Sequence, residues 1–311
     1  MTCAPVVAVF PGQGSQSSGM LAPWRGDRVV TDTIAEASEA VGLDLWQISE
    51  SGDPTALALT TNTQPLIVAM SVALWRAWQE RCSRRIEWAA GHSVGEIAAL
   101  VAAQALSLSD AMRIARRRAL AMSSALPGGT GTMAAVLGLG DATVERLCDQ
   151  CADGDVLEPV NYNAPGQVVV AGHVAAIERL KTVAREAGAK MVFILPVSGP
   201  FHSSLMLPAA SALASALDVI TVHPPIMRVL HNSNMAEATI ESIKPALVAQ
   251  LTSPVRWTDT MSFFGANGAT HMLEVGPGEV LCGLCRRIDP DVTPWPLHMP
   301  QGMDAAARAL E

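Results

Sequence analysis

The segment GHSVGE, residues 91–96, places a serine between two glycines at the end of an apolar run. In a G-x-S-x-G arrangement the glycines allow a sharp turn from a strand into a helix, which exposes the serine hydroxyl at the helix N-terminus. There the helix dipole and the amide of Val94 can stabilise an oxyanion that develops on an acyl group. The segment also fits S-x-x-E, so an ordinary helix cap formed by Ser93 and Glu96 is a second interpretation.

A serine nucleophile needs a base, and the chain offers seven histidines. His92 adjoins Ser93 but would point to the opposite side of the strand end. His202, in LPVSGPFHSSLM, follows a predicted strand and a Ser-Gly-Pro loop and opens a predicted helix, so its imidazole can lie at the edge of a sheet. Periodicity alone does not decide the choice, and His202 is the leading candidate. The remaining histidines are interpreted as structural or exposed: His173, His223, His231, His271 and His298.

A charged residue, Arg118, lies on the apolar stripe of the helix predicted over residues 110–125. An inward-facing guanidinium must meet an anion, because an unpaired buried charge is costly. Two interpretations stay open, an internal salt bridge and a bidentate clamp for a substrate carboxylate. Three further arginines of this helix project elsewhere and are expected to be solvated or paired with carboxylates: Arg113, Arg116 and Arg117.

Two other motifs carry weaker signals. The glycine-rich FPGQGSQ, residues 10–16, lacks phosphate-binding spacings, so we expect either backbone N–H donors presented to a reacting group or a plain turn. Two C-x-x-C pairs match the spacing of zinc or redox sites, but both lie in segments with helical periodicity, where this spacing places two small side chains on one face. We therefore expect free, buried thiols and no metal site at Cys148, Cys151, Cys282 and Cys285.

Composition limits the class of function. A chain of 311 residues, half of them apolar, can bury a substantial core. Its net charge of −8 argues against nonspecific binding of nucleic acid, so an acidic partner would need a local basic patch. The longest apolar run, residues 65–75, is shorter than a membrane span, and the N-terminal run lacks the basic start of a signal peptide. We expect a cytoplasmic protein that binds neither membrane nor nucleic acid.

Short β-branched runs alternate with longer helical patterns in the first part of the chain, which predicts an α/β fold with a parallel sheet covered by helices on both faces. A break rich in proline and glycine at residues 125–132 precedes a different order. That order is strand, helix, two strands, helix and strand, over residues 133–139, 142–152, 160–162, 167–171, 174–187 and 191–197, and it is typical of the ferredoxin-like βαββαβ unit. The α/β pattern then resumes, so we predict a discontinuous large domain over residues 1–126 and 199–311 and an inserted small domain over residues 127–198.

Several motifs occur together between Val9 and about Ile288: FPGQGSQ, Thr63-Gln64-Pro65, GHSVGE, Arg118-x-x-x-Met122, PVNYNAPGQVVVAG, VSGPFHSSLM, QLTSPVRW from Gln250 to Trp257, and EVGPGEVL. In order and spacing they resemble the malonyl-CoA:acyl-carrier-protein transacylases of bacterial fatty-acid synthesis. The resemblance implies transfer of a malonyl group from malonyl-CoA to the phosphopantetheine thiol of acyl carrier protein, by a ping-pong mechanism through a malonyl-serine and without a bound cofactor. It also implies an α/β-hydrolase-like core that carries a ferredoxin-like subdomain.

The resemblance further assigns roles to residues. Ser93 would be the nucleophile and His202 its general base, oriented by the backbone carbonyl of Gln250. The N–H groups of Gln13 and Val94 would form the oxyanion hole. Arg118 would bind the malonyl carboxylate, and the other substrate contacts would come from Gln64, Met122, Asn163 and Phe201. One departure is Ala119, where the family has glycine after the arginine.

The implied partner is an acidic carrier protein that binds transiently to a monomeric enzyme. Candidate docking residues are Arg116, Arg117, Lys190, Arg286 and Arg287. The alternatives are a serine esterase or thioesterase of the α/β-hydrolase type, a trans-acting acyltransferase of a polyketide or malonate-decarboxylase system, and a carrier-binding scaffold with an inactive site. In an α/β-hydrolase the histidine lies close to the C-terminus, whereas His202 precedes about a third of this chain.

Overall fold

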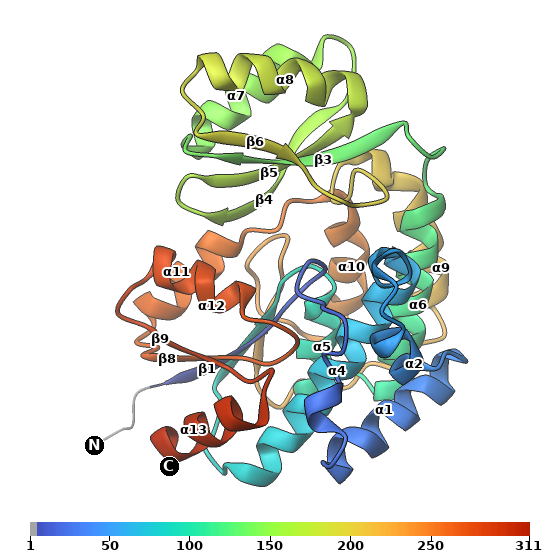
Figure 1. The fold of residues 1–311 in the computed structure, drawn as a ribbon, viewed down its shortest axis with the longest axis vertical. Helices are drawn as coiled ribbons and strands as arrows, with labels where there is room; N and C mark the ends of the chain where they lie inside the picture. Colours follow the sequence, from blue (N-terminus) through green and yellow to red (C-terminus); the bar gives the residue numbers. More distant parts are fainter. Residues whose placement is uncertain (1–4) are drawn as a thin grey trace.

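The computed structural model describes residues 5–311 and arranges them around two separate β-sheets (Figure 1). Residues 1–4, which include the predicted start of the large domain, lie outside the described residues. The larger sheet is parallel throughout and has the order β7-β2-β1-β8-β9. Its strands are β1 (Val6–Phe10), β2 (Trp88–Gly91), β7 (Arg228–Leu230), β8 (His271–Glu274) and β9 (Thr293–Pro296). The prediction of an α/β fold with a parallel sheet is confirmed.

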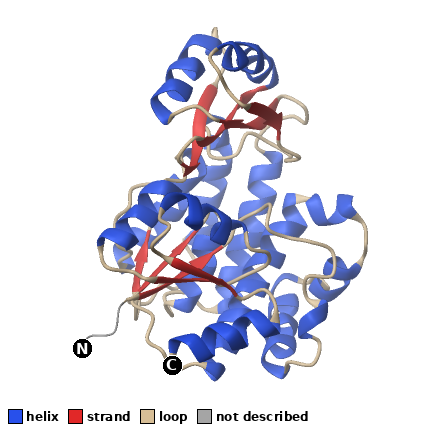
Figure 2. Cartoon of the chain, turned by 60° about the vertical axis from the view of Figure 1, so that its left-hand side comes forward, coloured by secondary structure: helices blue, strands red, loops and turns tan. Residues whose placement is uncertain are grey.

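Helices cover both faces of the parallel sheet (Figure 2). Strand β1 shows why, because its residues alternate between two cores. Val6, Ala8 and Phe10 pack into one, and Val7 and Val9 into the other. The helices of this part are α1 (Arg28–Val41), α2 (Leu45–Glu50), α3 (Pro54–Ala58), α4 (Thr60–Arg81), α5 (Gly95–Ala102), α6 (Leu108–Ser124), α9 (Leu207–Leu217), α10 (Ile240–Ala249), α11 (Trp257–Ala266), α12 (Val280–Ile288) and α13 (Pro300–Leu310), with short 3-10 turns at η1 (Ala22–Trp24), η2 (Ser204–Met206) and η3 (Gln250–Thr252).

The second sheet is antiparallel and has the order β4-β5-β3-β6. In the chain its elements follow as β3 (Gly131–Leu137), α7 (Asp141–Ala152), β4 (Leu157–Ala164), β5 (Gln167–His173), α8 (Val174–Glu186) and β6 (Met191–Ile194), which is the βαββαβ order expected from the sequence. Both helices lie on the face of this sheet that is turned away from the parallel sheet (Figure 1). On the opposite face, residues such as Met133, Ala135 and Val169 pack into the main core, which fixes the two sheets against each other.

The segment after β6 differs from the prediction. The strand expected over residues 191–197 ends at Ile194, and the helix expected to open at His202 begins later, with η2 at Ser204 and α9 at Leu207. Pro196 and Pro200 interrupt regular structure here, because proline lacks an N–H donor and fixes its own φ. His202 itself has φ 67°, a left-handed conformation that no helix continues.

The cysteines of residues 5–311 are buried free thiols: Cys82, Cys148, Cys151, Cys282 and Cys285. The two C-x-x-C pairs lie on α7 and α12, as the helical periodicity indicated. Burial raises the pKa of Cys148 to about 12 and that of Cys285 to about 11. In this described part of the chain, no group of three or more His, Cys, Asp or Glu side chains is placed to hold a metal ion. Nor does any helix between residues 5 and 311 offer an apolar stretch long enough to cross a bilayer.

Candidate active site

Ser93 lies in the turn that joins β2 to α5. Its φ of 52° is left-handed, a conformation that costs a residue with a side chain about 1–2 kcal/mol. The flanking glycines are required by space, because a Cβ on Gly91 would lie 2.0 Å from the carbonyl carbon of Gly95 and one on Gly95 would lie 2.1 Å from the Phe10 oxygen. The capping-box interpretation of S-x-x-E is wrong: Val94 occupies the N-cap, and the Glu96 carboxylate bonds elsewhere.

His202 contacts the serine hydroxyl. Its Nε2 lies 2.7 Å from Ser93 Oγ, and its Nδ1 lies 2.8 Å from the backbone oxygen of Gln250. Since a carbonyl oxygen only accepts, Nδ1 carries the ring proton and the Nε2 lone pair faces the hydroxyl. Burial, reinforced by the charge of Arg118, lowers the pKa of His202 to about 3, so the ring is neutral at neutral pH and can accept a proton from Ser93.

Arg118 reaches the same hydroxyl from the buried face of α6, where it is 1% exposed. Its Nη2 donates to Ser93 Oγ at 3.1 Å and to Gln250 Oε1 at 2.8 Å, and its Nη1 donates to Gln64 Oε1 at 2.9 Å. Its Nε is buried and has no acceptor within residues 5–311, and no carboxylate of that range pairs with it directly. Burial lowers the pKa of Arg118 to about 10, opposed by the charge of Glu96, so the guanidinium stays cationic at neutral pH. A direct internal salt bridge, one of the two interpretations left open for Arg118, is therefore absent from residues 5–311.

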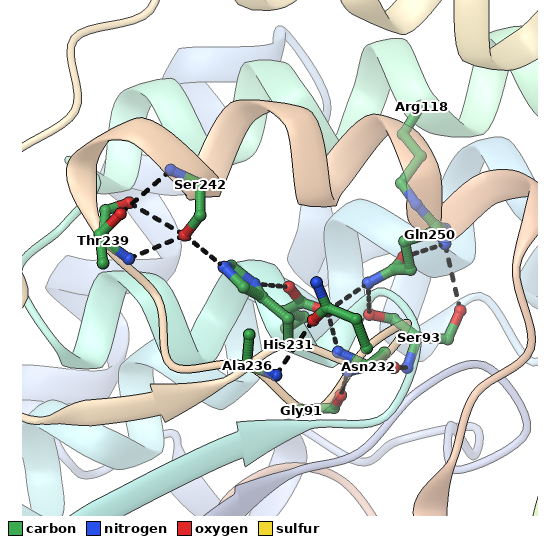
Figure 3. Close-up of polar contacts among 11 residues, drawn as sticks. Gly91, Ser93, Arg118, His231, Asn232, Ala236, Thr239, Ser242 and Gln250 are labelled. Carbon is green, nitrogen blue, oxygen red and sulfur yellow. Dashed lines mark hydrogen bonds and ion pairs between the residues drawn. The ribbon is translucent and has the colours of Figure 1, made fainter.

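The sequence did not indicate that Asn232 would hold this turn (Figure 3). Its Oδ1 accepts from the Ser93 N–H at 2.7 Å, and its Nδ2 donates to the Gly91 oxygen, so one carboxamide spans the turn. Its backbone N–H donates to Glu96 Oε2 at 3.1 Å. Asn232 follows β7, the strand that pairs with β2, and the carboxyl ends of adjacent parallel strands meet at one edge of a sheet. That rule could have found Asn232 once the strand order was known.

The other residues predicted to contact the substrate differ in whether they bond directly to Ser93, His202 or Arg118. Gln64, on α4, bonds Met122 Sδ at 3.6 Å as well as Arg118. Asn163, on β4, accepts at its Oδ1 from His92 Nε2 at 2.8 Å and has no direct bond to Ser93 or Arg118 among residues 5–311. Phe201 is buried beside His202.

The two proposed amide donors lie on two different turns. Val94 is buried at the start of α5. Gln13 lies in the loop after β1, where its side chain donates to Thr60 Oγ1 at 3.2 Å. This loop contacts the turn after β2 at Gly12, where an added Cβ would lie only 2.5 Å from the His92 backbone oxygen. The loop after β1 and the turn after β2 are therefore in contact.

The candidate docking residues fall into two groups. Arg116 donates to the Thr61 oxygen at 2.5 Å and, with Arg117, borders a groove of about 900 Å³ between α1, α6 and α9. Arg287, on α12, donates to Gln167 Oε1 and to the Pro165 oxygen in the turn between β4 and β5. Its neighbour Arg286 is exposed, and so is Lys190, which packs against Gly138, the residue after β3.

A serine on a strained strand-to-helix turn, a neutral histidine and a buried cation form an arrangement suited to acyl groups. Residues 7–286 match the model of the acyl transferase domain family, and the chain belongs to this family. It is 46% identical over 300 residues to the malonyl CoA-acyl carrier protein transacylase of Salmonella typhimurium, covering 96% of this chain and 97% of that protein.

Solved structures agree with this relationship. An acyl-carrier-protein S-malonyltransferase from Burkholderia pseudomallei superimposes with a TM-score of 0.95 at 44% identity, over 98% of this chain and 99% of that one. A malonyl-transacylase solved in complex with a type II PKS acyl-carrier protein gives a TM-score of 0.96 at 41% identity, over 98% of this chain and 100% of that one.

Proposed function

We propose that the protein transfers a malonyl group from malonyl-CoA to the phosphopantetheine thiol of an acyl carrier protein, and so supplies extender units for fatty-acid synthesis. The observation that carries this proposal is the 3.1 Å bond between Arg118 Nη2 and Ser93 Oγ, because it puts a buried cation within reach of any acyl group attached to that oxygen. The transacylase of Salmonella typhimurium and the two solved structures described above, all of them named for malonyl transfer, support the same substrate.

The chemistry is two acyl transfers through one serine ester. Ser93 Oγ attacks the thioester carbonyl while His202 Nε2 takes the hydroxyl proton, and the C–S bond then breaks and the CoA sulfur leaves with that proton. In the second half the carrier thiol gives its proton to His202 Nε2 and attacks the serine ester. The C–O bond breaks and Ser93 recovers its proton. The carbonyl of Gln250 keeps the imidazole in the required tautomer throughout.

The oxyanion of each tetrahedral intermediate would be stabilised by the backbone N–H groups of Val94 and Gln13. Val94 lies at the positive end of the α5 dipole, and Gln13 lies in the loop that contacts the Ser93 turn at Gly12. Further substrate contacts are proposed for Gln64, Met122, Asn163 and Phe201.

Selectivity would come from Arg118. A malonyl carboxylate would form a direct ion pair with the guanidinium, which contacts no carboxylate directly within residues 5–311, whereas an acetyl group offers it no charge. The site would then favour malonyl over neutral acyl groups through an ion pair that only the malonyl carboxylate can form.

We further propose how the chain divides into domains, where the protein acts and how it meets its carrier protein. The large domain, residues 1–126 and 199–311, is an α/β-hydrolase-like core, and the small domain, residues 127–198, is a ferredoxin-like subdomain. The strand order β4-β5-β3-β6, with both helices on one face, supports the latter. The enzyme is proposed to act as a cytoplasmic monomer that meets its acidic carrier protein transiently, through the basic residues Arg116, Arg117, Lys190, Arg286 and Arg287.

Intact-mass analysis after brief incubation with malonyl-CoA tests the proposed function. The wild type should gain one malonyl group and lose it when carrier protein is added, whereas Ser93→Ala should gain none. Arg118→Ala should load malonyl about 10²–10³ times more slowly, since it loses a buried ion pair with substrate, and should load acetyl-CoA no more slowly than the wild type. Arg113→Ala is the matched control, because Arg113 is exposed on the same helix and pairs with Asp110. Release of malonate to water at the same rate with and without carrier would instead identify a hydrolase.

A further inference from the structure

Glu96 holds a buried carboxylate one amide group away from Arg118. Its side chain is 0% exposed, and its Oε2 accepts from Gln250 Nε2 at 2.6 Å. The oxygen of the same Gln250 carboxamide accepts from Arg118 Nη2 at 2.8 Å. A single carboxamide, that of Gln250, therefore separates an anion from the cation that contacts Ser93 Oγ (Figure 3 labels Gln250 and Arg118).

The other partners of Glu96 are all donors. His231 Nδ1 lies 2.7 Å from Oε1, and the backbone N–H of Asn232 donates to Oε2 at 3.1 Å. On the far side of the ring, His231 Nε2 lies 2.9 Å from Ser242 Oγ, which accepts from the Thr239 N–H at 2.8 Å and can give its own proton either to the ring or to the Thr239 oxygen at 3.4 Å. A neutral His231 satisfies both contacts. The carboxylate accepts every bond directed at it, and a neutral carboxyl would place a proton against a donor.

We propose that Glu96 is a fixed counter-charge to Arg118 that limits how tightly the site holds a malonyl group, an inference that rests on the proposed function above. Without an acyl group, Glu96 compensates the buried guanidinium, which would otherwise be costly. With malonyl on Ser93, two anions share one cation, and Glu96 repels the malonyl carboxylate. That repulsion keeps the malonyl-serine from becoming too stable to pass its acyl group on to the carrier.

The substitution Glu96→Gln separates charge from shape. A glutamine oxygen can still accept from Gln250 and Asn232, and its NH₂ group can donate to His231 Nδ1. The ring then changes tautomer, and its Nε2–H donates to Ser242 Oγ. Every hydrogen bond of the cluster keeps a partner while the negative charge is lost. Glu96→Asp makes the opposite change, because it keeps the charge and shortens the side chain.

The position of the loading equilibrium measures the proposed effect. Enzyme is mixed with fixed ratios of malonyl-CoA and free CoA, and the malonylated fraction is read by intact mass. Glu96→Gln should shift the equilibrium constant about tenfold toward malonyl-enzyme, the order of magnitude expected when the repulsion between two unit charges is removed at an effective dielectric constant of about 20. The acetyl loading equilibrium of Glu96→Gln should stay within about twofold of wild type, because an acetyl group carries no charge for residue 96 to repel. In Glu96→Asp, both the malonyl and the acetyl equilibria should stay within about twofold of wild type, because the negative charge is kept.

The control is Glu274→Gln, which removes another fully buried carboxylate whose bonds are to Leu281 and Cys282 and not to this cluster. Its malonyl equilibrium should match the wild type. An unchanged or reduced malonyl constant in Glu96→Gln would overturn the proposal. A wild type that takes up no malonyl group would instead overturn the proposed function, so the two failures are distinguishable.

Thermal unfolding provides a test that does not need activity. If Glu96→Gln leaves Arg118 uncompensated, its midpoint should fall, and adding Arg118→Gln should raise it again. The same pair built on Glu274→Gln should instead show additive changes in the midpoint. A double variant Glu96→Gln/Arg118→Gln that is no more stable than Glu96→Gln alone would contradict the counter-charge, even if the single variant is only marginally folded.

Discussion

Strands β2 and β8 of the parallel sheet each lead through a glycine-rich turn into a helix, yet the two turns place the left-handed backbone on different residues. After β8, the positive φ values fall on Gly276 and Gly278, where no Cβ opposes them. After β2, the positive φ falls on Ser93. Only the turn after β2 accepts the cost of a side chain in this conformation, and that side chain is the proposed nucleophile.

Each turn also has a buried carboxylate, and these carboxylates have different partners. Glu274 accepts from the backbone N–H groups of Leu281 and Cys282, at 3.0 and 2.7 Å, and so caps the start of α12. Burial raises the pKa of Glu274 to about 7. Glu96 accepts from two side chains, His231 and Gln250, and from one backbone N–H. A carboxylate that caps a helix serves the fold, whereas one bonded to side chains around Ser93 can serve the reaction.

The largest expected difference between the two turns is in their tolerance of an added methyl group. In Gly95→Ala the new Cβ would lie 2.1 Å from the Phe10 oxygen, a backbone atom of a central strand that cannot move aside. We expect a loss of at least about 3 kcal/mol in the free energy of unfolding, or no folded protein. In Gly278→Ala the new Cβ would lie 2.9 Å from the Ser15 oxygen in a loop, with φ 70°, so about 1–2 kcal/mol is expected. Urea unfolding of both variants decides this, and equal losses would remove the distinction.

A second difference lies in the response to acid. Because the pKa of His202 is lowered from 6.5 to about 3, the unfolded chain binds a proton there that the native protein does not. Native stability from this group is present above pH 6.5 and is lost as the pH falls toward 3. The free energy of unfolding of the wild type should therefore fall, relative to that of His202→Asn, as the pH is lowered from 7 to 4. A pH-independent difference would show that the ring is not held neutral.

The smallest expected effect has the opposite sign. The pKa of Glu274 is raised from 4.5 to about 7, so the native protein retains a proton that the unfolded chain has released. Stability from this group is present below pH 4.5 and is lost as the pH rises through 7. Relative to the wild type, Glu274→Gln should gain stability between pH 5 and pH 8. Parallel curves for the two proteins over that range would refute the assignment.

Hydropathy patterns predicted most of the elements, because helices such as α4 and α6 are long and bury continuous or regularly spaced apolar residues. The same patterns placed Arg118 on the buried face of α6. They missed five short elements that follow loops, because so few residues carry little periodicity: α2, α3, α11, β9 and α13. They also extended β6 across Pro196, since an apolar run does not reveal where backbone pairing stops.

The polar cluster around Ser93 could not be predicted in the same way. Glu96, His231 and Asn232 come from two strand ends, and Gln250 from a third segment, so no spacing in the sequence reports that they meet. The S-x-x-E pattern pointed Glu96 at its own helix, because local bonds are the only ones that a pattern can describe. Tertiary contacts decided its partners instead.

The burial of the cysteines matters for the proposed substrates, which are thioesters. Coenzyme A and a carrier's pantetheine arm are thiols, and a thiolate on the protein surface would compete for their thioesters or form mixed disulfides with them. Burial raises the pKa of Cys148, Cys151, Cys282 and Cys285, so these thiols stay protonated and out of reach. Among residues 5–311, the group placed to react with a thioester is thus the Ser93 oxygen. Burial keeps the cysteine thiols from reacting with the thiols and thioesters of the proposed substrates.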